Sequence, residues 1–174
     1  MRSEKTLWIR FDEDDRMQPG PGFCLPSTWE REICLSDTYE QFSLVVFFPH
    51  DKHCPGCREV LEGFAEREQA YRDQESRILA IFPEPLEKLA ADEALQSLGF
   101  PVLSDEDGEV RSAYACLVDA SLIGPEDSFI YLLDAYGAPY IAVAAPDADR
   151  VTPAGELHED LLSWLQFIGL QCPE

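Results

Sequence analysis

The sequence predicts an α/β fold in which a central mixed sheet of four to five strands is flanked by helices. Apolar runs rich in β-forming residues alternate along the chain with segments whose apolar residues recur at helical spacing. Their order is strand, helix, strand, helix, then a hairpin and a last helix, which matches a right-handed βαβ unit followed by a ββα unit. The 174 residues are 45% hydrophobic, which is enough to bury the core of one domain.

The first part of the chain is polar. Residues 1–21 end in MQPGPG, so we expect an N-terminal arm or short strand there, ahead of a domain over residues 22–174. Within the arm, Thr6–Phe11 alternates in polarity as a strand does. Two short apolar patches follow the arm. They hold Cys24 and Cys34, which we expect to be inert core residues.

The middle of the chain predicts the βαβ unit. Ser43–Phe48 is a continuous apolar run, typical of a buried central strand. After a proline and a polar loop, apolar residues recur at helical spacing from Val60 to Tyr71. Arg77–Phe82 is the next buried strand. A second helix is expected over Leu86–Leu98, and a glycine follows it.

The last third predicts the ββα unit. Phe100–Leu103 is a short extended piece, and Asp105–Gly108 turns into a short helix. Phe129–Leu133 and Tyr140–Val143 are strands joined by the turn DAYGAP, so they form an antiparallel hairpin. The apolar stripe Leu157–Ile168 predicts the final helix.

The balance of charge is strongly acidic and excludes several classes of partner. Asp and Glu number 34 against 13 Lys and Arg, which gives a net charge of −21. A field of that sign repels phosphate backbones and anionic lipids, so we expect neither nucleic acid nor a membrane surface as a partner. No apolar run reaches the roughly 18 residues that a membrane-spanning helix needs. The N-terminus carries charge where a signal peptide needs an apolar stretch, so we expect a cytoplasmic location, where structural disulfides are disfavoured.

The motif Cys54-Pro55-Gly56-Cys57 carries the chemistry. It lies between a buried strand and a helix, where unpaired N–H groups and the helix dipole lower the pKa of a thiol. Pro55 suits the first turn of that helix because it has no N–H to lose. We expect Cys54 to be partly exposed at the start of the helix and Cys57 to reach back to it from one turn on. That spacing suits one attacking and one resolving thiol. His53 would lower the pKa of the Cys54 thiol if charged, or act as a base if neutral.

A structural zinc site is the main alternative for this loop. Its candidate ligands are His50, His53, Cys54 and Cys57, which crowd into one short stretch. A tetrahedral set of ligands on so short a loop would be strained, and no second CxxC motif exists. We therefore favour redox chemistry and expect no metal and no cofactor.

Three further residues have open roles. Cys116 is either a buried structural residue, as free cysteines commonly are, or an additional redox thiol. Cys172, near the C-terminus, is either a second resolving thiol or a relay for disulfides. His158 lies on the final helix, and we expect it to face solvent.

Four stretches carry a family resemblance: GFCLPSTWEREICLSD, LVVFFPHDKHCPGC, FPVLSDEDGEVRSAYAC and SFIYLLDAYGAPYIA. From about Gly20 to Gly169 the chain resembles the redoxin group of the thioredoxin superfamily, and within it the peroxiredoxin-like (alkyl hydroperoxide reductase/thiol-specific antioxidant) branch. The resemblance implies a thioredoxin fold with an N-terminal hairpin extension. It also implies oxidoreductase or antioxidant activity.

The peroxiredoxin resemblance implies that Cys57 attacks peroxide. Pro49 matches the family's proline, and Pro55-Gly56-Cys57 resembles the segment that ends in the peroxidatic cysteine. Cys54 then occupies the place of the family's Thr or Ser. The family's catalytic arginine is expected near the start of SFIYLL, but residues 124–128 are GPEDS. Arg111 and Arg150 are the arginines whose approach to the site would then matter.

The thioredoxin resemblance implies the opposite assignment. There the first cysteine, Cys54, is the nucleophile and Cys57 resolves the mixed disulfide. Phe48 stands where a buried Asp is usual. Pro125 would be the family's cis-proline beside the pair, or else an ordinary loop proline.

The sequence thus predicts a thiol–disulfide oxidoreductase that cycles a Cys54–Cys57 dithiol and disulfide. Its partners would be a disulfide-containing protein or a low-molecular-weight thiol, with a thiol reductant for recycling. The alternative enzyme is a thiol peroxidase in which Cys57 attacks the peroxide and Cys54 resolves. An alternative of another class is a redoxin-fold module that binds metal or a partner without catalysis.

Overall fold

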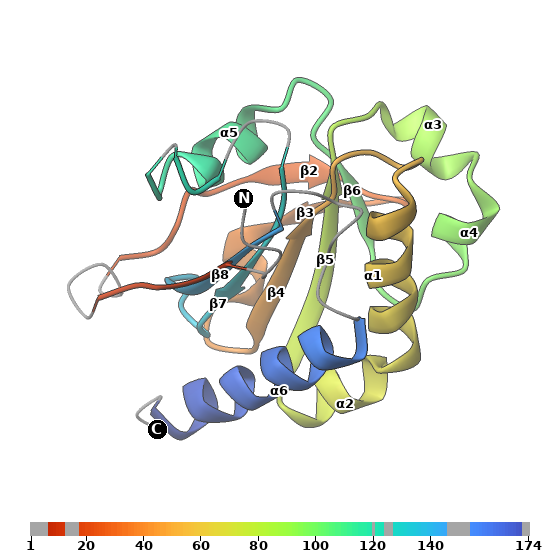
Figure 1. Ribbon diagram of the computed structural model, residues 1–174. Helices are drawn as coiled ribbons and strands as arrows, with labels where there is room; N and C mark the ends of the chain where they lie inside the picture. Colours follow the sequence, from red (N-terminus) through yellow and green to blue (C-terminus); the bar gives the residue numbers. More distant parts are fainter. Residues whose placement is uncertain (1–6, 13–17, 120, 124–126, 146–153, 172–174) are drawn as a thin grey trace, which may run out of the picture.

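The computed structural model describes residues 7–12, 18–119, 121–123, 127–145 and 154–171 (Figure 1). Its main feature is a mixed sheet of strand order β1-β8-β7-β4-β5-β6. The central strand β4 is parallel to β5, as the βαβ pattern predicts, and antiparallel to β7. β7 and β8 form the antiparallel hairpin that the sequence predicts. The strands are β1 (Leu7–Arg10), β2 (Cys24–Pro26), β3 (Glu32–Cys34), β4 (Ser43–Phe48), β5 (Ser76–Phe82), β6 (Val102–Ser104), β7 (Ser128–Leu133) and β8 (Pro139–Ala145).

The sheet has six strands rather than the four to five expected. The additional edge strand is β1, which lies within the predicted arm over residues 1–21. It pairs antiparallel with β8, from Leu7 opposite Ala144 to Arg10 opposite Ile141. The pairing partners lie far apart in the sequence, so local pattern could not reveal them. The boundary between the arm and a domain over residues 22–174 stays a prediction.

Helices and a small hairpin cover the two faces of the sheet (Figure 1). One face packs against α1 and α6, and the other against α5 and the β2–β3 hairpin. The expected single helix over Leu86–Leu98 is two short helices, because the Asp92 carboxylate accepts the backbone N–H groups of Ala94 and Leu95 and starts a new helix there. The helices are α1 (Pro55–Glu66), α2 (Glu68–Asp73), α3 (Leu86–Ala90), α4 (Glu93–Gln96), α5 (Glu109–Ala115) and α6 (Ala154–Gln171), with a 3₁₀ helix η2 (Leu35–Thr38).

The β2–β3 hairpin confirms the expected N-terminal extension but corrects the expectation for its cysteines. Cys24 and Cys34 are directly opposite each other in the antiparallel register and form a disulfide. Cys24 is exposed and Cys34 is half-buried, so neither is an inert core residue. The apolar patches alone did not reveal that two short strands pair here with these two side chains on the same face.

His158 is a second correction, because it is fully buried rather than facing solvent. It lies on the side of α6 that packs against α1, where Gly63 leaves room for its ring: a Cβ atom at position 63 would lie 2.3 Å from His158 Nε2. The Tyr71 hydroxyl is 2.7 Å from His158 Nδ1. The imidazole is therefore part of the core.

Over the described residues, no helix is long and apolar enough to cross a membrane.

Candidate active site

The CPGC motif lies where β4 leads into α1, as expected. The helix begins at Pro55, and Cys54 is its N-cap residue. The Cys54 sulfur accepts the backbone N–H of Cys57 at 3.4 Å. Pro49, the residue after β4, is buried. The strand end and the helix start thus bring the two thiols together in the first turn of α1.

The Cys57 sulfur is held by hydrogen-bonding groups from two further segments. The backbone N–H of His50 donates to it at 3.3 Å. The Ser128 hydroxyl, from the start of β7, lies 3.1 Å away. Hydrogen-bond donors aimed at a sulfur favour its ionised form, and the N-terminus of α1 acts in the same direction. The polar contacts from these segments thus converge on the Cys57 sulfur.

Arg111 supplies a positive charge to this site from α5. Its guanidinium is buried and donates to the Pro49 carbonyl at 2.8 Å and to the Asp127 carbonyl. Burial lowers the pKa of Arg111, whereas the charges of Cys57, Asp105 and Asp127 raise it. The guanidinium is thus close enough to Cys57 for their charges to interact.

The sequence contained one signal for Arg111. It lies three positions before Tyr114, so both side chains share the buried side of a short helix. A buried arginine needs a partner, and here the partners are backbone carbonyls beside the thiols. Arg150, the other arginine considered, lies outside the described residues.

Cys54 differs from the expectation of an exposed, low-pKa thiol. Burial, followed by a hydrogen bond to the Cys57 side chain, raises the pKa of Cys54 to about 11. Cys54 is 7% exposed and Cys57 is 2% exposed. The α1 dipole does not overcome the loss of water at Cys54, because the sulfur packs inside the core cluster on that face of the sheet. Cys54 is therefore a protonated thiol at neutral pH.

The loop before the motif is held by polar contacts. The Lys52 N–H donates to the Glu84 carboxylate at 2.7 Å, and the Lys52 carbonyl accepts Arg58 Nε at 2.6 Å. Arg58 also pairs with Asp92 at 2.6 Å. His53 is exposed, and within the described part of the chain its side chain bonds to neither thiol. The loop contributes backbone N–H groups to the site more directly than it contributes imidazoles.

The remaining candidate residues do not join the site. Cys116 is exposed at the C-terminal end of α5, where we expected burial to be more common. Pro125 and Cys172 lie outside the described residues. The described residues contain one group of side chains close enough to share a metal ion, Cys24, Glu32 and Cys34, and its two sulfurs are joined in the disulfide.

Comparison with known proteins identifies the family. The AhpC/TSA family model matches residues 17–138, and the chain belongs to this family. A Mycobacterium tuberculosis (strain H37Rv) protein named as a peroxiredoxin is 30% identical over 112 residues, which cover 63% of this chain and 71% of the relative. A Buchnera aphidicola protein named as the peroxiredoxin Bcp is 26% identical over 118 residues, which cover 66% of this chain and 74% of the relative.

Solved structures confirm the thioredoxin fold. The peroxidoxin BcpB of Mycobacterium tuberculosis superposes with a TM-score of 0.71 at 19% identity, covering 87% of this chain and 96% of that one. A thiol:disulfide interchange protein DsbE of Chlorobium tepidum gives 0.64 at 19% identity, covering 85% and 96%. Proteins named for each of the two predicted activities thus share this fold, so the choice between the activities must rest on the geometry of the site.

Proposed function

We propose that the protein is a thiol peroxidase in which Cys57 attacks the peroxide and Cys54 resolves. One observation carries this proposal: the groups that stabilise a thiolate converge on Cys57. His50 N–H and the Ser128 hydroxyl reach its sulfur, and the Arg111 guanidinium is close enough to interact with its charge. Relatives named as peroxiredoxins support the same assignment.

The reaction balances with two thiols of this chain and an external reductant. The Cys57 thiolate attacks one oxygen of a hydroperoxide, the O–O bond breaks, and the alcohol leaves after taking up a proton. Cys57 becomes a sulfenic acid. The Cys54 thiol then attacks the Cys57 sulfur, water leaves, and the Cys54–Cys57 disulfide forms. Two equivalents of an external thiol reopen this disulfide and leave as a disulfide themselves.

The burial of the two sulfurs favours a small oxidant. A protein disulfide must bring two sulfurs and their flanking chains in line with the attacking thiolate. A hydroperoxide presents only two oxygen atoms. Because Cys57 is 2% exposed, the small molecule has the easier approach.

Disulfide exchange with Cys54 as the attacking thiol is the less favoured assignment. With its pKa at about 11, roughly one Cys54 thiol in ten thousand is ionised at pH 7. A resolving thiol attacks a sulfenic acid that is held beside it, so the small ionised fraction of Cys54 is offset by the high effective concentration of an intramolecular step. We also propose that a low-molecular-weight thiol or a small dithiol protein serves as the reductant, and that the protein works in the cytoplasm.

Single-turnover oxidation of the reduced protein by hydrogen peroxide tests the proposal. The wild type should lose two thiols per peroxide and form the Cys54–Cys57 disulfide. Cys54→Ser should still react rapidly and accumulate a sulfenic acid on Cys57, trapped by dimedone and located by mass spectrometry. Cys57→Ser should react no faster than a free thiol.

Cys116→Ser is the matched control, since it removes a thiol outside the site, and its rate should equal that of the wild type. The proposal fails if Cys54→Ser abolishes rapid oxidation. It also fails if the wild type reduces insulin disulfides readily while Cys57→Ser reacts with peroxide as the wild type does.

A further inference from the structure

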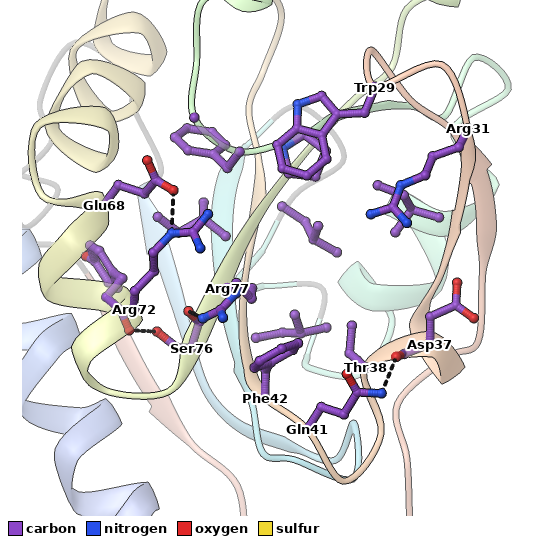
Figure 2. Close-up of a pocket in the computed structure, with 18 residues that line it drawn as sticks. Trp29, Arg31, Asp37, Thr38, Gln41, Phe42, Glu68, Arg72, Ser76 and Arg77 are labelled. Carbon is purple, nitrogen blue, oxygen red and sulfur yellow. Dashed lines mark hydrogen bonds and ion pairs between the residues drawn. The ribbon is translucent and has the colours of Figure 1, made fainter.

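A cavity with mixed polar and apolar walls lies at the other end of the sheet from the thiols. It encloses about 360 Å³ between the β2–β3 hairpin, η2, α2 and the first residues of β5 (Figure 2). Leu44, at the start of β4, is part of its wall, whereas Cys57 follows the opposite end of that strand. Four residue steps of extended chain separate Leu44 from Phe48, or about 13 Å. The cavity is therefore not the peroxide site.

Arginines gather in this cavity although the chain as a whole is strongly acidic. Arg31 reaches in from the hairpin, and Arg77 lies on the side of β5 (Figure 2). Among the described residues, neither guanidinium has a carboxylate within ion-pair distance. Arg72, also in the wall, pairs with Glu68 at 2.7 Å. In a chain with a net charge of −21, two arginines without a carboxylate partner in one cavity leave a local excess of positive charge.

The carboxylates near this cavity already have partners. Besides the Glu68 pair, the Asp37 carboxylate accepts the backbone N–H of Cys34 at 3.1 Å. Glu68 thus offsets the charge of Arg72, and the single charge of Asp37 is outnumbered by those of Arg31 and Arg77. An anion entering the cavity would meet the Arg31 guanidinium and the N–H groups of Arg77 other than the one that donates to the Ser76 carbonyl at 2.9 Å. Guanidinium groups bind a carboxylate or a phosphate through paired hydrogen bonds.

Flat aromatic surfaces flank these guanidinium groups. Arg77 Cζ lies 4.0 Å from the centre of the Phe42 ring, and Arg31 Cζ lies 5.9 Å from that of the Trp29 ring. Trp29 is 42% exposed, which is unusual for so large an apolar side chain. Aromatic walls of this kind stack on planar groups, and the volume falls within the range of small-molecule sites.

We propose that this cavity binds a small planar aromatic molecule that carries one anionic group. The ring stacks against Trp29, and Arg31 and Arg77 hold the anionic group, with Arg77 itself supported by the Phe42 ring. Aryl carboxylates and nucleoside monophosphates both have this chemistry. The proposal is independent of the thiol chemistry, because the cavity shares no residue with the Cys57 site.

Isothermal titration calorimetry on the whole chain tests this site with three probes: naphthalene-2-carboxylate, its uncharged amide, and adenosine monophosphate. At least one of the two anions should bind with one molecule per chain, and the tighter of the two identifies the source of the anionic group. The amide should bind at least tenfold more weakly than the carboxylate. Arg31→Gln and Arg77→Gln should each weaken anion binding at least tenfold.

Arg10→Gln is the matched control, since Arg10 also lies over aromatic rings, those of Trp164 and Phe167, but outside this cavity. It should bind the anion as the wild type does, and all three variants should keep the wild-type rate of peroxide consumption. Arg31 is exposed, so its substitution keeps the test intact even if Arg77→Gln fails to fold. Absence of binding by both anions at millimolar concentration overturns the proposal, and so does equal binding by the wild type and Arg31→Gln.

Discussion

Arg111 supplies the positive charge beside Cys57. Its side chain reaches the site from α5 and not from the start of β7, where the family resemblance placed an arginine. Its guanidinium crosses to the Pro49 carbonyl, 62 positions earlier in the chain. The Asp105 carboxylate accepts the Arg111 backbone N–H at 2.8 Å and so fixes the start of this helix. Ser128 takes the place beside the sulfur on β7. Arg111 thus joins α5 to the segment after β4 and to the segment before β7.

Replacing Arg111 should therefore impair Cys57 specifically. We expect Arg111→Gln to slow peroxide consumption at least tenfold, since one lost charge-stabilising donor commonly costs more than that. On a Cys54→Ser background, alkylation of Cys57 by iodoacetamide should also become slower at pH 7, and its pH profile should move to higher pH. Arg111→Lys should recover part of both effects. An unchanged alkylation profile would reduce Arg111 to a structural role.

His158 makes the stability of the fold depend on pH. Burial, with a smaller contribution from Arg67, lowers the pKa of His158 to about 4. In the unfolded chain the same imidazole titrates near its ordinary pKa of 6.5. As the pH falls from about 6.5 to about 4, the unfolded state takes up a proton that the folded state refuses. The free energy of unfolding should therefore fall over this window, by about 3 kcal/mol for this residue.

Urea unfolding at several pH values measures this dependence. His158→Phe should be less stable than the wild type at pH 7, because the Tyr71 hydroxyl loses its partner, but its stability should fall less steeply between pH 6.5 and 4. His53→Ala removes an exposed imidazole and should keep the full wild-type slope. A His158→Phe slope equal to that of the wild type would contradict the assignment.

At the scale of elements, the packing of α1 against α6 places a glycine where a helix would otherwise prefer alanine. Gly63 is in the interior of α1, and an added Cβ atom would lie 2.3 Å from His158 Nε2. A Cβ atom added at Gly169, in α6, would have no neighbouring atom within 4 Å. The two glycines thus separate the intrinsic helix preference from the effect of packing.

We expect Gly63→Ala to destabilise the protein by about 1–3 kcal/mol, as overpacking of a well-filled core does. Gly169→Ala should leave stability unchanged or raise it by up to about 1 kcal/mol, because alanine loses less backbone freedom in a helix. Urea unfolding at pH 7 gives both values. The packing argument fails if both substitutions stabilise the fold.

Local pattern predicted most elements of the whole molecule but not their distant contacts. The apolar run Ser43–Phe48 and the motif that follows it were enough to place the thiols at the start of a helix. The pairing of Leu7 with Ala144 and the bond between Tyr71 and His158, which spans 87 positions, depend on how the elements pack. The Arg111 guanidinium reaches the thiols for the same reason. Sequence could therefore indicate the candidate pair, but not which of the two sulfurs receives the hydrogen bonds from His50 and Ser128.

The net charge of −21 should act on the two halves of the catalytic cycle differently. Hydrogen peroxide is neutral, so the rate at which it oxidises the protein should not depend on salt.

The reductant that reopens the Cys54–Cys57 disulfide approaches through a negative field, which attracts cations and repels anions over roughly a Debye length. The attacking form of each thiol is the thiolate, so cysteamine reacts as a neutral zwitterion, 2-mercaptoethanol as a monoanion and 2-mercaptoethanesulfonate as a dianion. Salt should thus leave reduction by cysteamine nearly unchanged, speed reduction by 2-mercaptoethanol, and speed reduction by 2-mercaptoethanesulfonate most. For each thiol the rate at high salt is compared with its own rate at low salt, so differences in intrinsic reactivity between the thiols cancel. Stopped-flow reduction of the oxidised protein between about 0.02 and 0.5 M sodium chloride, where screening tightens severalfold, measures these slopes. Equal slopes for cysteamine and 2-mercaptoethanesulfonate would mean that local groups on the loop, such as Lys52, govern the approach of the reductant, and that the charge of the whole molecule does not.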